Sequence, residues 1–151
     1  MCDHCDCREL APIGELSTEH ERIGSLAALL RREVESGSPD RAAALSALQA
    51  ALGPHLAKEE IGLFAQLEGR PGFAWYVEQL HGEHARARSS LLSPDAVQMS
   101  APEVLAALDD LSEHIQTEEY DLFPASRLIL DDLAWAKVAA AHDTANAHAT
   151  R

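Results

Sequence analysis

The sequence has few aromatic residues, few β-branched residues and no long apolar run. Phe, Trp and Tyr together make up 5% of its 151 residues, whereas Ala and Leu dominate. Helix formers therefore outnumber strand formers, and the composition favours an all-α fold. No stretch approaches the roughly 18 uncharged apolar residues of a membrane-spanning helix, and no basic segment followed by an apolar run indicates a signal peptide. We expect a cytoplasmic protein that makes no contact with a membrane.

Basic residues are also scarce. The chain has 12 Lys and Arg against 25 Asp and Glu, which gives a formal net charge of −13. This charge repels phosphate backbones, so we expect no binding to nucleic acid. Most of the carboxylates serve solubility, but that does not explain acidic residues on helix faces that point inward. A length of 151 residues with 46% hydrophobic residues is enough for one domain with a core.

The only cysteines are Cys2, Cys5 and Cys7, which lie with His4 at the N-terminal end. An odd count in a cytoplasmic protein argues against a structural disulfide framework. A short Cys/His tract can hold a soft metal or remain a tail with reduced thiols, and both interpretations stay open.

A ten-residue motif, His-x3-Glu-Glu-x2-Leu-Phe, occurs twice, at residues 55–64 and 114–123. A Glu-His dipeptide precedes each copy, as Glu19-His20 and as Glu83-His84. Each half of the chain therefore supplies one helix with a lone His and one with His and Glu. This internal similarity predicts a pseudo-symmetric helical bundle, because the period is too long and the copies too few for a solenoid.

The apolar periodicity predicts helices at about 15–36, 39–68, 73–92, 101–124 and 128–142, with a kink or a break at Pro54. The short turns between them make neighbouring helices antiparallel. We therefore expect an up-down four-helix bundle with an additional C-terminal helix over residues 12–142. Residues 1–11 are expected to form a Cys/His-rich tail, and residues 143–151 a second tail.

The repeated residues share one helix face and one level of the bundle. A His and a Glu four residues apart project from the same side of a helix, and counting back from the turns brings the four helices into register at ~1.5 Å per residue. Several buried carboxylates in one layer repel one another, and two cations between them would remove that penalty. The pattern favours a metal site over neutral His–Glu pairs. The candidate ligands are His20, His55, Glu59, His84, His114 and Glu118, with His81 at the edge of its helix face.

This arrangement resembles the hemerythrin-like (HHE) family, in which one His, a His-x3-Glu, another His and another His-x3-Glu are followed by Leu-Phe. The resemblance covers roughly residues 12–124 and implies a four-helix bundle. It further implies two non-haem irons, oxo- or hydroxo-bridged, that bind dioxygen at one open position. The resemblance implies that His20, His55, His84 and His114 are terminal iron ligands, with His81 as a fifth. It also implies that Glu59 and Glu118 bridge the two irons.

Two features depart from the oxygen carriers of that family. Their third helix has His-x3-His, whereas His81 and His84 are spaced by three. Their fourth helix uses an acid five residues after its His, which would select Glu119 instead of Glu118. The Glu-x-x-His motif of ferritin-like bundles occurs only at Glu78–His81, so that fold is disfavoured. His142 and His148 are expected to face solvent.

Three functional hypotheses follow. The first is a di-iron protein that binds or senses dioxygen. The second is a di-iron redox enzyme that acts on peroxide or nitric oxide, and the third is an iron-sensing regulatory protein. In each case the expected partner is a small diatomic or peroxide molecule, or iron itself.

Overall fold

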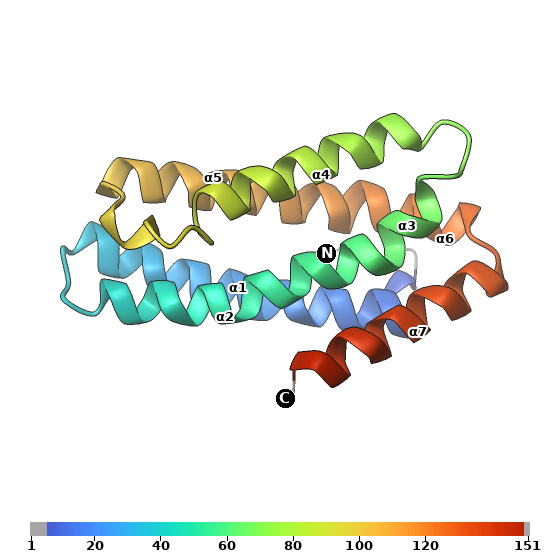
Figure 1. The fold of residues 1–151 in the computed structure, drawn as a ribbon, viewed down its shortest axis with the longest axis horizontal. Coiled ribbons are helices and arrows are strands. Elements are labelled where there is room, and N and C mark those ends of the chain that lie inside the picture. Colours follow the sequence, from blue (N-terminus) through green and yellow to red (C-terminus); the bar gives the residue numbers. More distant parts are fainter. Residues whose placement is uncertain (1–5, 150–151) are drawn as a thin grey trace.

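The computed structural model describes residues 6–149, which form helices and no strands (Figure 1). The predicted all-α bundle with an additional C-terminal helix is confirmed. In chain order the elements are η1 (Cys7–Glu9), α1 (Ala11–Glu35), α2 (Arg41–Glu59), η2 (Glu60–Phe64), α3 (Ala65–Leu67), α4 (Ala74–Ser89), η3 (Ala96–Gln98), α5 (Ala101–Thr117), η4 (Glu118–Leu122), α6 (Phe123–Ile129) and α7 (Asp132–Ala149).

The bundle consists of two antiparallel helix pairs. Figure 1 shows α1 running beside α2 and α4 beside α5, with α7 crossing the α1–α2 side. The chain reverses after α1 at Gly37 and before α4 at Gly72, whose φ values of 63° and 84° lie in the left-handed region that favours glycine. The predicted capping box opens α5, because Ser100 Oγ accepts from the amide of Glu103 while the Glu103 carboxylate accepts from the amide of Ser100.

α2 continues through Pro54, where the sequence predicted a kink or a break. Three other features differ from the prediction. α1 begins at Ala11, and η1 packs against it, with Cys7 buried in the core. α7 continues to Ala149, beyond residue 142, where the sequence predicted the start of a tail. The continuous helix expected up to residue 68 contains a π-helical turn, η2, and a matching turn, η4, follows α5.

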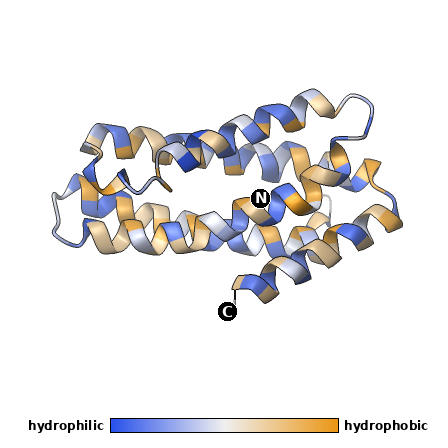
Figure 2. Cartoon of the chain, in the orientation of Figure 1, coloured by the Kyte–Doolittle hydropathy of each residue, from blue (hydrophilic) through white to orange (hydrophobic). Residues whose placement is uncertain are grey.

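Two hydrophobic clusters fill the bundle, one at each end. One joins η1, α3, α6 and α7 to the nearby ends of α1 and α4, and the other joins α1, α2, α4 and α5 near their connecting loops. Figure 2 shows hydrophobic and hydrophilic residues alternating along the helices, as expected for amphipathic helices in a bundle. On α1 and α4 the repeated histidine falls between residues of the two clusters, whereas on α2 and α5 it lies near the end of the second cluster, before the first cluster resumes in η2 and η4. The hydrophobic core is thus interrupted by one polar layer.

Among residues 6–149, no helix is both long and apolar enough to cross a lipid bilayer.

Candidate metal centre

The polar layer contains four histidines and two glutamates that are almost completely buried. Both Glu59 and Glu118 are 0% exposed, and none of the four histidines exceeds 6%. The histidines come one from each long helix, at His20 on α1, His55 on α2, His84 on α4 and His114 on α5. An unpaired buried carboxylate is costly, so this layer needs compensating charge.

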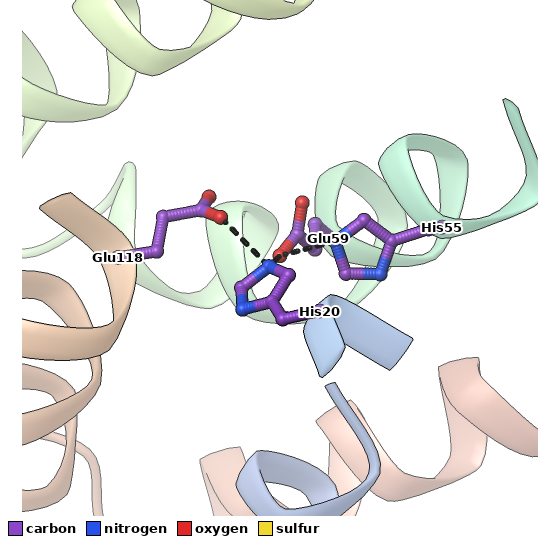
Figure 3. A group of neighbouring side chains, drawn as sticks. All are labelled: His20, His55, Glu59 and Glu118. Carbon is purple, nitrogen blue, oxygen red and sulfur yellow. Dashed lines mark ion pairs between the residues drawn. The ribbon is translucent and has the colours of Figure 1, made fainter. Parts of the chain in front are cut away.

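The six residues form two overlapping groups of four possible metal ligands. One group is His20, His55, Glu59 and Glu118, and the other is Glu59, His84, His114 and Glu118. Within each group one ligand atom from every residue lies within 4.8 Å of the others. Figure 3 shows the first group, with all four side chains pointing toward one another. Both carboxylates belong to both groups.

The distances explain how the carboxylates are shared. Glu59 Oε1 lies 3.3 Å from His55 Nε2 and 3.6 Å from His20 Nε2, whereas its Oε2 lies 3.4 Å from His84 Nε2. One oxygen of Glu59 therefore faces each group.

Glu118 approaches both groups with only one of its two carboxylate oxygens. Its Oε2 is 3.2 Å from His20 Nε2 and 3.3 Å from His114 Nε2. In the second group, the Nε2 atoms of His84 and His114 approach each other to 3.1 Å. All four Nε2 atoms thus point into the same layer.

The other ring nitrogen of each histidine donates to a second glutamate. The four Nδ1–carboxylate pairs, with distances from 2.6 to 2.9 Å, are His20–Glu119, His55–Glu19, His84–Glu60 and His114–Glu83. An ionised carboxylate only accepts hydrogen bonds, so Nδ1 must carry the hydrogen. In a neutral imidazole, Nε2 is then left with a lone pair, which is the form that binds a metal.

These pairings give a role to residues that the sequence motif contained without explanation. The glutamate before His20 and the glutamate before His84 bind the histidine of the neighbouring helix in the same half. The second glutamate of each Glu-Glu pair binds the lone histidine of the other half. The signal was present as the repeated Glu-His and Glu-Glu dipeptides, but the partners depend on how the helices pack.

Basic residues lie behind these outer glutamates. Arg88 forms a bidentate ion pair with Glu60, in which two guanidinium nitrogens lie 2.7 and 3.0 Å from the two carboxylate oxygens. Lys58 binds Glu19, and Arg8 of η1 lies 3.7 Å from Glu119. The layer therefore continues outward as imidazole, carboxylate and cation.

The phenylalanine of each Leu-Phe pair packs on a histidine of the other half. The Phe123 ring is stacked on His20 with centroids 5.6 Å apart, and the Phe64 ring lies 5.0 Å from His84. Both phenylalanines are almost fully buried. They limit the movement of the imidazoles and keep water away from the layer on this side.

A π-helical turn follows α2 and another follows α5, and both begin close to a shared carboxylate. η2 starts at Glu60, directly after Glu59, and η4 starts at Glu118 itself. Single π-helical turns occur frequently at functional sites, because the wider turn changes the direction of nearby side chains. Here η2 includes Leu63 and Phe64, and η4 extends from Glu118 to Leu122, so each turn joins a shared carboxylate to its Leu-Phe pair.

The pKa values show strong coupling between imidazoles and carboxylates. Burial lowers the pKa of His55, but the carboxylates of Glu59 and Glu19 together outweigh it and the pKa is raised to about 9. Burial also lowers the pKa of His20, whereas hydrogen bonding to Glu118 and its neighbours raises it well above its usual value. For Glu59, burial raises the pKa and His55 lowers it, with a result well below the usual range. Protonated imidazoles thus balance the buried carboxylates, and a bound cation would replace those protons.

The donor atoms fit a pair of metal ions. Within residues 6–149, the buried atoms that lack a hydrogen-bond partner include Nε2 of His20 and His55 and both carboxylate oxygens of Glu59 and Glu118. Buried polar atoms normally have a partner, and here the unpaired ones face one another. Imidazole nitrogen with carboxylate oxygen is a donor set suited to iron or zinc.

Not every predicted residue lies in this layer. His81 is 37% exposed, its Nε2 donates to the Glu68 carboxylate at 2.8 Å, and it belongs to neither group. Glu118 lies in both groups, whereas Glu119 binds Nδ1 of His20.

Two predictions outside the repeat have different outcomes. The expectation that His142 faces solvent is wrong, because its side chain is 1% exposed and its Nδ1 donates to Glu15; α7 packs it against η2. His148 is exposed, as expected. Of the Cys/His tract, Cys7 is buried and disulfide-bonded, whereas Cys2 and Cys5 lie outside the described residues.

Two hollows reach the ligand layer from the surface. One, with a volume of about 460 Å³, lies between α1 and α5 and is lined by His20, Gly24 and Ile115 among others. The other, about 160 Å³, lies between α4 and α5 and is lined by His84 and His114. Each group of ligands can therefore be approached by a small molecule.

Fold, repeat and ligand layer together define a cation-binding helical bundle. Residues 11–126 match the family model described as the hemerythrin HHE cation-binding domain. The chain therefore belongs to the hemerythrin family of HHE cation-binding domains. No curated protein and no solved structure matches it.

Proposed function

We propose that the chain binds two iron ions and uses them to bind or sense dioxygen. The observation that carries this proposal is the pair of four-residue groups that share both Glu59 and Glu118. Shared carboxylates favour two neighbouring cations over one, because Glu59 directs one oxygen to each group and Glu118 has one oxygen near both. The proposed ligands are His20, His55, Glu59, His84, His114 and Glu118.

The surroundings of the site support small-molecule chemistry. Two irons held there would supply a reducible centre that reacts with small oxidants. The outer glutamates keep each Nε2 directed inward, and the phenylalanines limit water. The hollows beside His20 and beside His84 leave a route for a diatomic molecule or peroxide.

Metal analysis after anaerobic loading with Fe²⁺ tests this proposal. We expect about two irons per chain and, after exposure to air, a visible spectrum that reverts when oxygen is removed. One zinc and no iron would contradict it. Rapid loss of the spectrum with turnover of added peroxide would instead favour a redox enzyme.

Iron sensing is a second candidate, and the unpaired buried atoms favour it. Without a cation, the carboxylates of Glu59 and Glu118 have only imidazoles to balance them. Metal binding would then order the bundle, and the ordered surface could be recognised by a partner. A melting temperature that rises only with iron, without a reversible response to oxygen, would support this function.

A further inference from the structure

One buried lysine lies directly behind the candidate metal centre. Lys58 is 3% exposed and donates to the carboxylates of Glu15, at 2.7 Å, and of Glu19. Glu19 also accepts a hydrogen bond from Nδ1 of His55 at 2.8 Å. Lys58 therefore reaches a proposed metal ligand through a single carboxylate.

Glu15 connects the same lysine to the C-terminal helix. Its carboxylate accepts from Nδ1 of His142 at 2.8 Å and from the side-chain amide of Asn146 at 2.7 Å, both on α7. The His142 ring lies so close to η2 that a Cβ added to Gly62 would be 3.2 Å from it. α7 is thus attached to the bundle beside the first pair of ligands.

The two halves differ at the positions that carry this network. When the two copies are aligned on their histidines, the second half has a different residue at each position, namely Thr117 for Lys58, Gln79 for Glu15 and Asp121 for Gly62. The ligands and their outer glutamates are the same in both halves. α7 packs chiefly against α1, α2, α3 and η2, which belong to the first half. The departures from the repeat therefore coincide with the contact surface of α7.

In the second half, the cation behind the histidine and its outer glutamate is exposed to solvent. Behind His84, the glutamate Glu60 is paired with Arg88, whose side chain is 42% exposed. Solvent screens such a pair, whereas the buried Lys58 is screened much less. The orientation of His55 is accordingly the more firmly held.

We propose that Lys58 is a positioning residue that holds His55 through Glu19, and that α7 secures Lys58 through Glu15. As a result, the His20–His55 position of the metal pair binds its ion more tightly than the His84–His114 position. This inference rests on the proposed metal pair. Its physical basis is that partners of a ligating histidine fix its ring orientation, and losing one weakens metal affinity roughly 10–100-fold.

Titration of the metal-free protein with Fe²⁺ under anaerobic conditions, against a competing chelator, tests the inference. We expect two binding steps in the wild type. In Lys58→Met the tighter step weakens, by less than the roughly 10–100-fold expected for losing Glu19, the direct partner of His55. The other step stays unchanged, and Lys58→Arg weakens the tighter step less than Lys58→Met does. The control is Lys137→Met, which removes the only other lysine, exposed on α7, and should behave as the wild type.

A spectroscopic measurement separates positioning from a general effect on folding. In Mössbauer spectra of protein loaded with ⁵⁷Fe, the Lys58→Met substitution should change the signal of one iron and leave the other. If Lys58→Met does not fold, Glu15→Gln provides the test, because it keeps the Lys58–Glu19 contact and weakens the contacts of Glu15 with Lys58 and with α7. It should weaken the same step by a smaller factor.

The outcomes are distinguishable. If the wild type does not bind two ions, the proposed metal pair is wrong and this inference falls with it. If the wild type binds two ions, but Lys58→Met or Glu15→Gln leaves both steps unchanged or weakens both equally, the metal pair stands and the positioning role is overturned.

Discussion

The half of the bundle built from α1 and α2 and the half built from α4 and α5 present the same donor groups to the central layer. Each contributes two histidines and one shared carboxylate, with two outer glutamates. Behind that layer they differ, because only the first half has a buried lysine and the cover of α7. Inward positions carry the same candidate ligands in both halves, whereas outward positions follow the neighbouring helix.

The two ligand groups have the same donors but unequal surroundings. The asymmetry does not need a different ligand. It arises one residue further out, where Lys58 faces Glu19 in one half and Thr117 takes the matching position in the other.

The largest effect is expected at the shared carboxylates. Glu59→Ala and Glu118→Ala should each reduce bound metal from about two ions per chain to one or none, because each carboxylate faces both groups. Elemental analysis after metal loading measures this. The control is Glu60→Ala, which changes the adjacent outer glutamate and should retain two ions at roughly 10–100-fold lower affinity. A loss in Glu60→Ala as complete as in Glu59→Ala would contradict the assignment.

The second prediction separates the two histidines of α4. His84→Ala should remove a ligand and weaken the second metal position strongly, whereas His81→Ala should leave two ions bound, because His81 is 37% exposed and paired with Glu68. Chelator competition with each variant gives the comparison. Equal losses would make His81 a fifth histidine ligand.

The third prediction concerns pH. The pKa of folded His55 is about 9, above its usual value near 6.5. Its protonation therefore stabilises the metal-free fold fully below about pH 6.5, and this contribution is lost as the pH rises toward 9. The melting temperature of the metal-free protein should fall across that interval, while the metal-loaded protein, with neutral imidazoles, should change less. Parallel melting curves for the two forms would contradict this linkage.

The smallest effect is expected from two glycines within helical segments. A Cβ at Gly24 would meet no other atom within 4 Å, so Gly24→Ala should stabilise α1 by about 1 kcal/mol. A Cβ at Gly62 would lie 3.2 Å from the His142 ring, so Gly62→Ala should gain less or destabilise. Urea denaturation of the metal-free variants measures both. An equal gain at the two sites would show that the α7 contact is loose.

Much of the fold and the ligand layer could be predicted because the relevant signals are local. The spacing of His55 and Glu59, and of His114 and Glu118, determines that each pair shares a helix face. Apolar periodicity and turn residues determine the helix number and the antiparallel order. The capping box at Ser100 and Glu103 acts within four residues and is found as predicted.

The tertiary structure decided which groups meet across helices. No local pattern shows that Glu119 binds His20, because this depends on the π-helical turn and on the distance between helices. The burial of His142 depends on α7 folding back onto η2, through a contact between residues far apart in the sequence. Periodicity determines the direction in which a side chain leaves its own helix, but its partner is set by packing, which is a property of the whole chain.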